Sequence, residues 1–261
     1  MLSAKERSEL LNRNAESARF LHRYVGSQEI SKGIVRYALL IPDQEVDVAL
    51  AIPEIVKRVQ RVKAVRLGSS KVSTRNVLSN TPHRYELISS TGERPSVAVA
   101  RTTSETRKYL ATDILREGTI ANDNAFFAEE DKLVIFSVLV SRLHHSWIAT
   151  ICGRMKNDYR YANTLGWNTF PVPKLTAKNK ADLTRCAEDI LLAREAHFPA
   201  TIADLYKSDA MPENLRHAHE RNDEVLERIY IGRRFKNDTE RLEKLFELYT
   251  KMTKLKKQGR K

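Results

Sequence analysis

The stretch from Val140 to Leu175 constrains the fold most, because its character changes abruptly at Gly153. Before this glycine, apolar residues recur at three- and four-residue steps, the spacing that places side chains on one face of an α-helix. This spacing predicts one buried helix, whose apolar positions are Phe136, Val140, Leu143, Trp147 and Ile151. After the glycine, the stretch runs to Phe-Pro-Val-Pro, where the prolines exclude helix.

The segment after Gly153 is rich in groups that contact nucleic acids. Between Val140 and Leu175 there are five cations and a single anion, Asp158. Aromatic and amide side chains lie among them, at Tyr159, Tyr161, Trp167, Asn157, Asn163 and Asn168. Such groups hold phosphates and read or stack on bases. A second interpretation stays open, in which the rings belong to the core and the cations form a solvated rim.

Composition narrows the class of partner. The 261 residues leave room for one large or two small domains. A formal net charge of +12 and a pI near 9.7 indicate a polyanion, with nucleic acid first and an acidic membrane surface second. No apolar run is long enough to span a bilayer and no signal-peptide pattern opens the chain, so we expect a cytoplasmic protein. Cys152 and Cys186 predict neither a disulfide framework nor a zinc site.

Strand-like segments dominate up to Pro173, and helices follow it. Residues 1–19 are charged and helix-prone, and we expect a linker or helical lead-in there. Strands are predicted at 24–25, 34–41, 84–89, 96–100, 109–110 and 125–127, with a helix at 52–65. Further helices are expected at 183–194, 212–232 and from 237 onward. The predicted fold class is α+β, with a mixed α/β domain at 20–173 and a small helical C-terminal region at 174–261.

Two polar segments have the chemistry of backbone contacts to DNA. From Glu54 to Arg75 there are seven cations and one anion. Hydroxyls and cations alternate in the last part of this segment and again from Arg101 to Arg107, a combination that binds phosphate oxygens. Solvated loops have a similar composition, so that alternative stays open. The candidate backbone contacts are Ser70, Lys71, Thr74, Arg75, Arg101, Ser104, Arg107, Arg154 and Arg160.

Lys156 and Asp158 are the candidates for base reading. In an extended segment, a spacing of two residues places both side chains on one face. Lysine donates to guanine O6 and N7, and aspartate accepts from cytosine N4, so together they would read one G·C pair. The alternative is a surface ion pair of little energetic value.

Catalytic machinery is missing from the sequence. A methyltransferase that uses S-adenosylmethionine needs a Gly-rich strand–helix turn, and an adenine-N6 enzyme also needs an Asn/Asp-Pro-Pro-Tyr/Phe loop for the flipped base. Neither pattern occurs, and no carboxylate–carboxylate–lysine nuclease core is evident. His144 and His145 are adjacent, so on a helix they point about 100° apart and are expected to serve packing or phosphate contact. We therefore assign no catalytic or metal-binding residue.

The segments ISKGIVRY and GRMKNDYRYANTLGWNTFPVP resemble the target-recognition part of single-chain type II restriction–modification enzymes of the MmeI-like (type IIL) kind. In that family an adenine methyltransferase is followed by a target-recognition domain and a short helical C-terminal region. The resemblance runs from about Phe20 to about Tyr249 and includes, in order, RYVGSQEI, TSETRKYL, NDNAFF, ADLY, MPENLRHAH and ERLEKLFELY. Where this chain has Lys156 and Asp158, the family has a charged pair that covaries with one base pair of the target, and Lys/Asp is consistent with G.

The resemblance implies the sequence-specific DNA-binding part of a type II restriction–modification DNA adenine-N6 methyltransferase. The domains that bind S-adenosylmethionine and cut DNA would lie elsewhere, so we expect no cofactor in this chain and no activity from it alone. Its partners would be double-stranded DNA and a separate methyltransferase or endonuclease chain, with no membrane. Two alternatives stay open: a non-specific nucleic-acid-binding protein, and a specificity subunit that works only with a separate methyltransferase.

Overall fold

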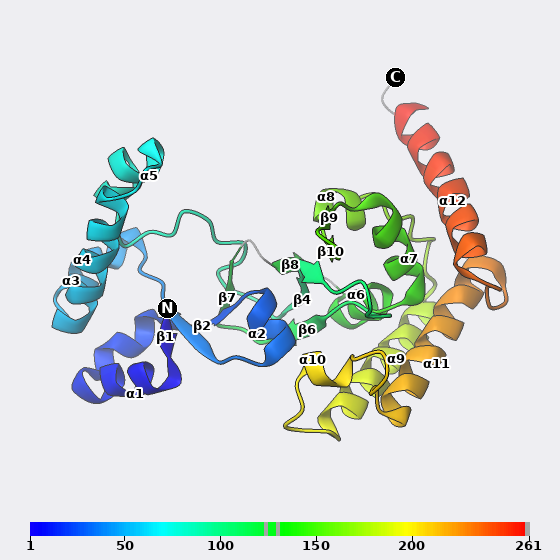
Figure 1. The fold of residues 1–261 in the computed structure, drawn as a ribbon, viewed down its shortest axis with the longest axis horizontal. Helices are drawn as coiled ribbons and strands as arrows, with labels where there is room; N and C mark the ends of the chain where they lie inside the picture. The colour runs from blue at the N-terminus through cyan, green and yellow to red at the C-terminus, as the bar shows by residue number, and fades with distance from the viewer. Residues whose placement is uncertain (123–124, 129–130, 259–261) are drawn as a thin grey trace.

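A computed structural model describes residues 1–122, 125–128 and 131–258, and places an α+β part beside a bundle of helices (Figure 1). Two residues of the NDNAFF segment, at positions 123 and 124, lie outside the described ranges. A four-stranded sheet has the order β1-β3-β2-β7. Strand β2 (Leu21–Val25) runs antiparallel to β3 (Arg36–Leu39) and parallel to β7 (Thr119–Ala121). Strand β1 (Leu2–Ser3) pairs with β3, so residues from the expected lead-in belong to this sheet.

Two three-stranded sheets complete the α+β part. Strand β4 (Ser96–Ala100) lies between β6 (Thr112–Leu115) and β8 (Ala125–Ala128), and all five of its residues are buried. Because both faces of this strand are buried, alanines rather than charged residues lie next to Val97 and Val99. The third sheet is a ribbon of short strands, β5 (Thr102–Thr103), β10 (Asp158–Arg160) and β9 (Arg154–Met155), which carries the predicted base-reading segment.

Helices pack around the first sheet near the N-terminus. Helix α1 (Ala4–Arg13) begins with a capping box in which Ser3 and Glu6 each satisfy the other's backbone amide. A 3-10 turn (Ala15–Phe20) leads from it into β2, and α2 (Ser27–Lys32) follows that strand. A 3-10 turn (Asp43–Glu45) and α3 (Val46–Leu50) precede α4 (Pro53–Leu67), which confirms the helix predicted at 52–65. Helix α5 (Val72–Asn76) and a 3-10 turn (Leu78–Asn80) lie in the segment expected to be polar loop.

The single helix predicted from Phe136 to Ile151 is wrong, because the chain forms two helices bent by 64°. Helix α6 (Lys132–Leu139) ends before Ser141, whose side chain caps α7 (Arg142–Ile151) by accepting the His144 amide at 3.1 Å. The apolar spacing continues across the bend because both helices face the same core. Among the described residues, no single helix is long and apolar enough to cross a membrane. The bent pair α6–α7 reaches that length and apolar composition only when its two helices are taken together.

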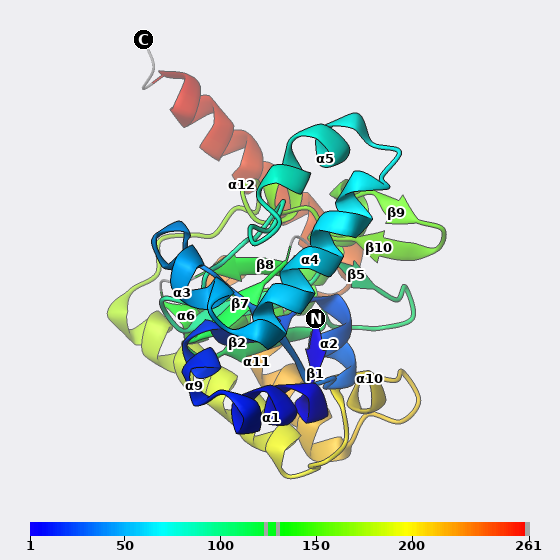
Figure 2. The same ribbon diagram turned by 90° about the vertical axis from the view of Figure 1, so that its left-hand side faces the viewer.

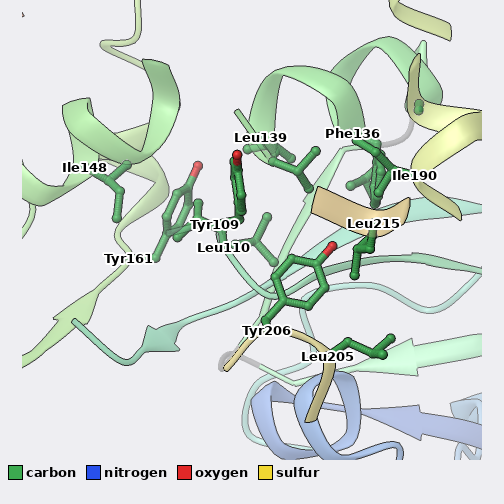
Figure 3. Close-up of a cluster of buried hydrophobic side chains, with 14 of the residues drawn as sticks. Tyr109, Leu110, Phe136, Leu139, Ile148, Tyr161, Ile190, Leu205, Tyr206 and Leu215 are labelled. Atoms are coloured by element: carbon green, nitrogen blue, oxygen red, sulfur yellow. The ribbon is translucent and has the colours of Figure 1, made fainter. Parts of the chain in front are cut away.

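Helices form the described chain after Pro173, as predicted. A short α8 (Asn163–Gly166) precedes them, and α9 (Ala177–Glu195), α10 (Ile202–Leu205), α11 (Glu213–Ile231) and α12 (Asp238–Gln258) make up the bundle. Helix α9 packs between α6 and α11 through Ile190, whose side chain is fully buried. Figure 3 shows Ile190 and Phe136 on facing helices, with Leu215 of α11 beside them.

Two predicted strands are absent from the described residues. The segment 84–89 is irregular because its polar groups bind other elements: Arg84 binds Asp43, and its carbonyl accepts from Arg66. The segment 109–110 is irregular too, and regular pairing starts only at Thr112. Tyr109 and Leu110 are buried in the core, so their hydrophobic character reflects core packing and not a strand.

A buried carboxylate joins the α+β part to the helical bundle. Asp223 of α11 accepts the Arg142 backbone amide at 2.7 Å and the Tyr109 hydroxyl at 3.0 Å. Burial raises the pKa of this carboxyl to about 7, against the lowering effect of both hydrogen bonds. Next to it, Asn222 binds Ser137 through both its amide oxygen and its nitrogen. The junction is therefore polar and directional as well as apolar.

We predict that Asp223→Asn removes a specific part of the pH dependence of stability. The folded pKa of about 7 lies above the unfolded value of about 3.9, so the folded chain binds this proton more tightly. The free energy of unfolding should therefore fall as the pH rises from about 4 to about 7 in the wild type, and less so in the variant. Urea unfolding at several pH values measures this; parallel curves for the two proteins would contradict the prediction.

We also predict that Ile190→Ala lowers the free energy of unfolding by about 2–5 kcal/mol, the usual cost of such a cavity in a packed core. Leu192→Ala on the same helix is the matched control, since Leu192 is 63% exposed and should cost less than about 0.5 kcal/mol. Thermal or chemical unfolding of both variants measures the difference. If both variants were destabilised equally, the face of α9 that carries Ile190 would not be the one that packs in the core.

Candidate nucleic-acid interface

The strands β9 and β10 form a hairpin closed by Lys156 and Asn157. Lys156 has a φ of 57°, the left-handed conformation that tight hairpin turns require. Met155 pairs with Asp158 across the hairpin, and β10 pairs on its other side with β5. The tip of this hairpin extends away from the body of the protein (Figure 2).

The expectation that Lys156 and Asp158 lie on one face of an extended segment is wrong. The two residues do not alternate along one extended strand, because Lys156 lies in the turn and Asp158 opens the returning strand. Lys156 is exposed, whereas Asp158 is partly buried and lines a cavity with Arg107. They remain close in the hairpin, so their predicted role in reading one base pair stays a prediction.

Arg154 makes one contact within the hairpin and one to the segment that follows β5. Its guanidinium lies 4.6 Å from the centre of the Tyr159 ring and 3.1 Å from the Glu105 carboxylate. Tyr159 packs edge-on against His145, with ring centres 5.5 Å apart. Arg160 is exposed, and among the described residues no carboxylate pairs with it or with Lys156. These two cations at the hairpin are therefore available to a polyanion.

The strand β5 brings the second predicted segment to the same place. The Arg101 amide donates to Ser27 Oγ at 2.9 Å, and the Arg101 carbonyl accepts from the Tyr161 amide at 2.7 Å. Ser104 Oγ lies 3.1 Å from Thr106 Oγ1, at the rim of the cavity. Burial lowers the pKa of Arg107 while the Asp158 carboxylate acts in the opposite direction.

The third predicted segment lies elsewhere, on the α4–α5 hairpin. Lys71 forms an ion pair with Glu86, and Arg75 Nη1 donates to the Ser69 carbonyl at 3.0 Å. Ser70 is exposed and Thr74 partly buried on the same hairpin. Figure 1 places the α4–α5 hairpin at the opposite end of the molecule from the helical bundle, and the β9–β10 hairpin nearer to that bundle. The candidate residues thus form two separate groups.

Several aromatic groups in the basic segment belong to the core, as the second interpretation allowed. Tyr161 is 2% exposed, and its hydroxyl lies 3.2 Å from His144 Nε2. Burial lowers the pKa of His144 to about 3 and that of His145 to about 4, so both imidazoles are neutral at physiological pH. The packing alternative for the two histidines is thereby favoured over phosphate contact. In the described part of the chain, no group of His, Cys, Asp or Glu side chains could hold a metal ion.

The sequence interpretation missed the helix α2, which faces Asp158 across a cavity of 660 Å³, a volume within the range of ligand-binding pockets. Gln28, Ser31 and Lys32 of α2 line one wall, opposite Arg107 and Asp158. Helix α2 packs against β2, β4 and β6, and the chain continues from β4 into β5. The spacing of Gln28, Ser31 and Lys32 could have indicated that they share one face of a helix. Nothing in the sequence indicated that this face lies opposite β10.

The comparisons with known proteins agree with this arrangement. The family described as "MmeI, target recognition domain" matches residues 1–174, and "MmeI, C-terminal domain" matches residues 175–256. DNA methyltransferase A of Bacillus subtilis (strain 168) is 31% identical over 253 residues, which is 97% of this chain but 28% of that protein.

A solved structure of the type IIL restriction–modification enzyme MmeI in complex with DNA superposes with a TM-score of 0.88 and 26% identity. That match covers 97% of this chain and 34% of the MmeI chain, so the chain spans about a third or less of each of these relatives. The order of an α+β part and a helical part, the two domain matches and the shared fold lead to one conclusion. This chain belongs to the MmeI family and comprises its target-recognition and C-terminal domains.

Proposed function

We propose that this chain recognises a specific sequence in double-stranded DNA on behalf of a restriction–modification adenine-N6 methyltransferase. The observation that carries the proposal is the β9–β10 hairpin, which presents Lys156 and Arg160, without carboxylate partners in the described ranges, beside the carboxylate of Asp158. A cation and a carboxylate on one projecting element offer both a donor to guanine and an acceptor for cytosine. The solved MmeI structure is described as a complex with DNA, which supports the same partner.

The two groups of candidate residues have different roles in this proposal. Cations and hydroxyls on the α4–α5 hairpin hold phosphates, which supplies affinity and orients the duplex without reading its sequence. The β9–β10 hairpin reads base edges. Because the ribbon β5-β10-β9 is fixed to α7 through Tyr159 and His145, its side chains are presented from a rigid support.

The chemistry of methyl transfer belongs to a part of the enzyme outside this chain. S-adenosylmethionine would bind there, and the target adenine would be flipped into that part. A separate methyltransferase or endonuclease chain would then be a protein partner, and the cytoplasm is the compartment we propose. Selection of duplexes from a randomised library by the purified chain, at about 0.15 M salt, tests the proposal. Enrichment of a short motif supports it, whereas equal binding of all duplexes indicates a non-specific DNA-binding protein.

We predict that exchanging the charged pair, Lys156→Glu with Asp158→Arg, changes the preferred base at one position of the selected motif. Each side chain would then offer the opposite hydrogen-bonding group to the same base pair. Selection with the variant measures this, and Lys156→Gly is the control, because glycine accepts the positive φ without presenting a side chain. Uniform weakening on all sequences would show that Lys156 contacts only phosphate.

We predict that neutralising Lys71, Arg75 and Arg107 flattens the dependence of log K on log salt. The slope should decrease by about 0.9 for every phosphate that the variant leaves without a cation, since fewer counterions are released on binding. A matched variant neutralises three exposed cations of the helical bundle, Lys178, Arg216 and Arg228. Binding titrations at several salt concentrations measure both slopes; equal slopes for the two variants would remove the first set from the interface.

A further inference from the structure

We propose that the polar face of α2 is a second base-reading element, in which Gln28 and Lys32 contact the base pair next to the one that faces Asp158. The inference rests on the proposed function and extends it to a helix that is not part of the β9–β10 hairpin. It starts from the cavity of 660 Å³ between α2 and the ribbon β5-β10-β9.

Helix α2 has one buried apolar face and one exposed polar face, as a helix that contacts a ligand requires. Ile30 is 4% exposed and packs into the cluster formed by Val25, Ala98, Ala100, Ala111 and Leu115. Gln28 and Lys32 are four residues apart, so both lie on the opposite face, and both are exposed at the cavity. Their side chains are therefore free to meet a ligand while the backbone of the helix stays buried on the core side.

Hydrogen bonds and an ion pair fix α2 to its neighbours, and one of them joins it to the junction of β4 and β5. The Glu29 carboxylate accepts the Gly26 amide at 3.0 Å and lies 3.2 Å from Arg36 Nη1. Ser27 Oγ accepts the Arg101 amide at the junction of β4 and β5. A Cβ at Gly26 would lie 2.9 Å from Asn122 Nδ2, so the start of the helix packs closely against that side chain. Base reading needs such rigid support, since small displacements disrupt bidentate hydrogen bonds.

The chemistry of the cavity suits a base edge better than a phosphate. Two carboxylates, Glu29 and Asp158, line it and would repel an anion. Arg36 pairs with Glu29, whereas no carboxylate in the described part of the chain forms an ion pair with Lys32 or Arg107. A base edge presents donors and acceptors side by side, as this lining does. Glutamine is suited to bidentate contact with adenine, and lysine to guanine.

Selection from randomised duplexes by Gln28→Ala and Lys32→Ala variants of the full chain tests the inference. We expect discrimination to fall about tenfold at one base pair adjacent to the position changed by the Lys156/Asp158 exchange, and to stay unchanged elsewhere in the motif. Lys178→Ala is the matched control, because the Lys178 side chain is 85% exposed on α9 and does not line the cavity.

Three outcomes would overturn the inference, and they differ in what they say of the proposed function. An unchanged motif with unchanged affinity removes α2 from the interface and leaves the proposed function intact. A uniform decrease in affinity for every duplex makes Gln28 and Lys32 backbone contacts only, again without affecting that function. Failure of the wild-type chain itself to enrich any motif overturns both. Circular dichroism of the variants, which should match the wild type, excludes unfolding as the cause of any decrease.

Discussion

The hydrogen bonds of Asp223 are the constraint on which the rest of the structure depends. This carboxylate comes from α11 in the C-terminal domain and accepts the amide of Arg142, the first residue of α7. The first amides of a helix lack partners within it, so a buried helix start must be satisfied from elsewhere. Asp223 and the cap residue Ser141 do this together. The direction of α7, and of everything that follows it, is thereby set by the helical bundle.

The candidate interface follows directly from that arrangement. Helix α7 ends at Ile151, and the β9–β10 hairpin begins three residues later at Arg154. His145 of the same helix supports Tyr159 of the hairpin, and burial keeps its imidazole neutral. The helical bundle therefore does more than close the core: it orients the hairpin that we propose reads DNA. This gives a physical reason for the two family domains to occur in one continuous chain.

Charges are used in two ways in the molecule. In the junction, Arg142 binds Asp238 at 2.6 Å, while the buried Glu227 pairs with Arg241, so these charges serve structure. At the β9–β10 hairpin, the cations Lys156 and Arg160 have no carboxylate partner among the described residues. A buried charge without a partner is costly, whereas an exposed one is solvated and remains available to a polyanion. Part of the net charge of +12 thus resides on a surface that can meet DNA.

The sequence by itself determined the helices after Pro173, the strand at 96–100 and the family resemblance, because periodicity, caps and motifs are local properties. It also located the cations and hydroxyls at which phosphate contacts are proposed. Only the tertiary structure decided the bend at Ser141, the turn at Lys156, the burial of Tyr161 and the position of α2 across from Asp158. These depend on hydrogen bonds and packing between residues distant in sequence, as between Arg142 and Asp223, and no local pattern records such partners.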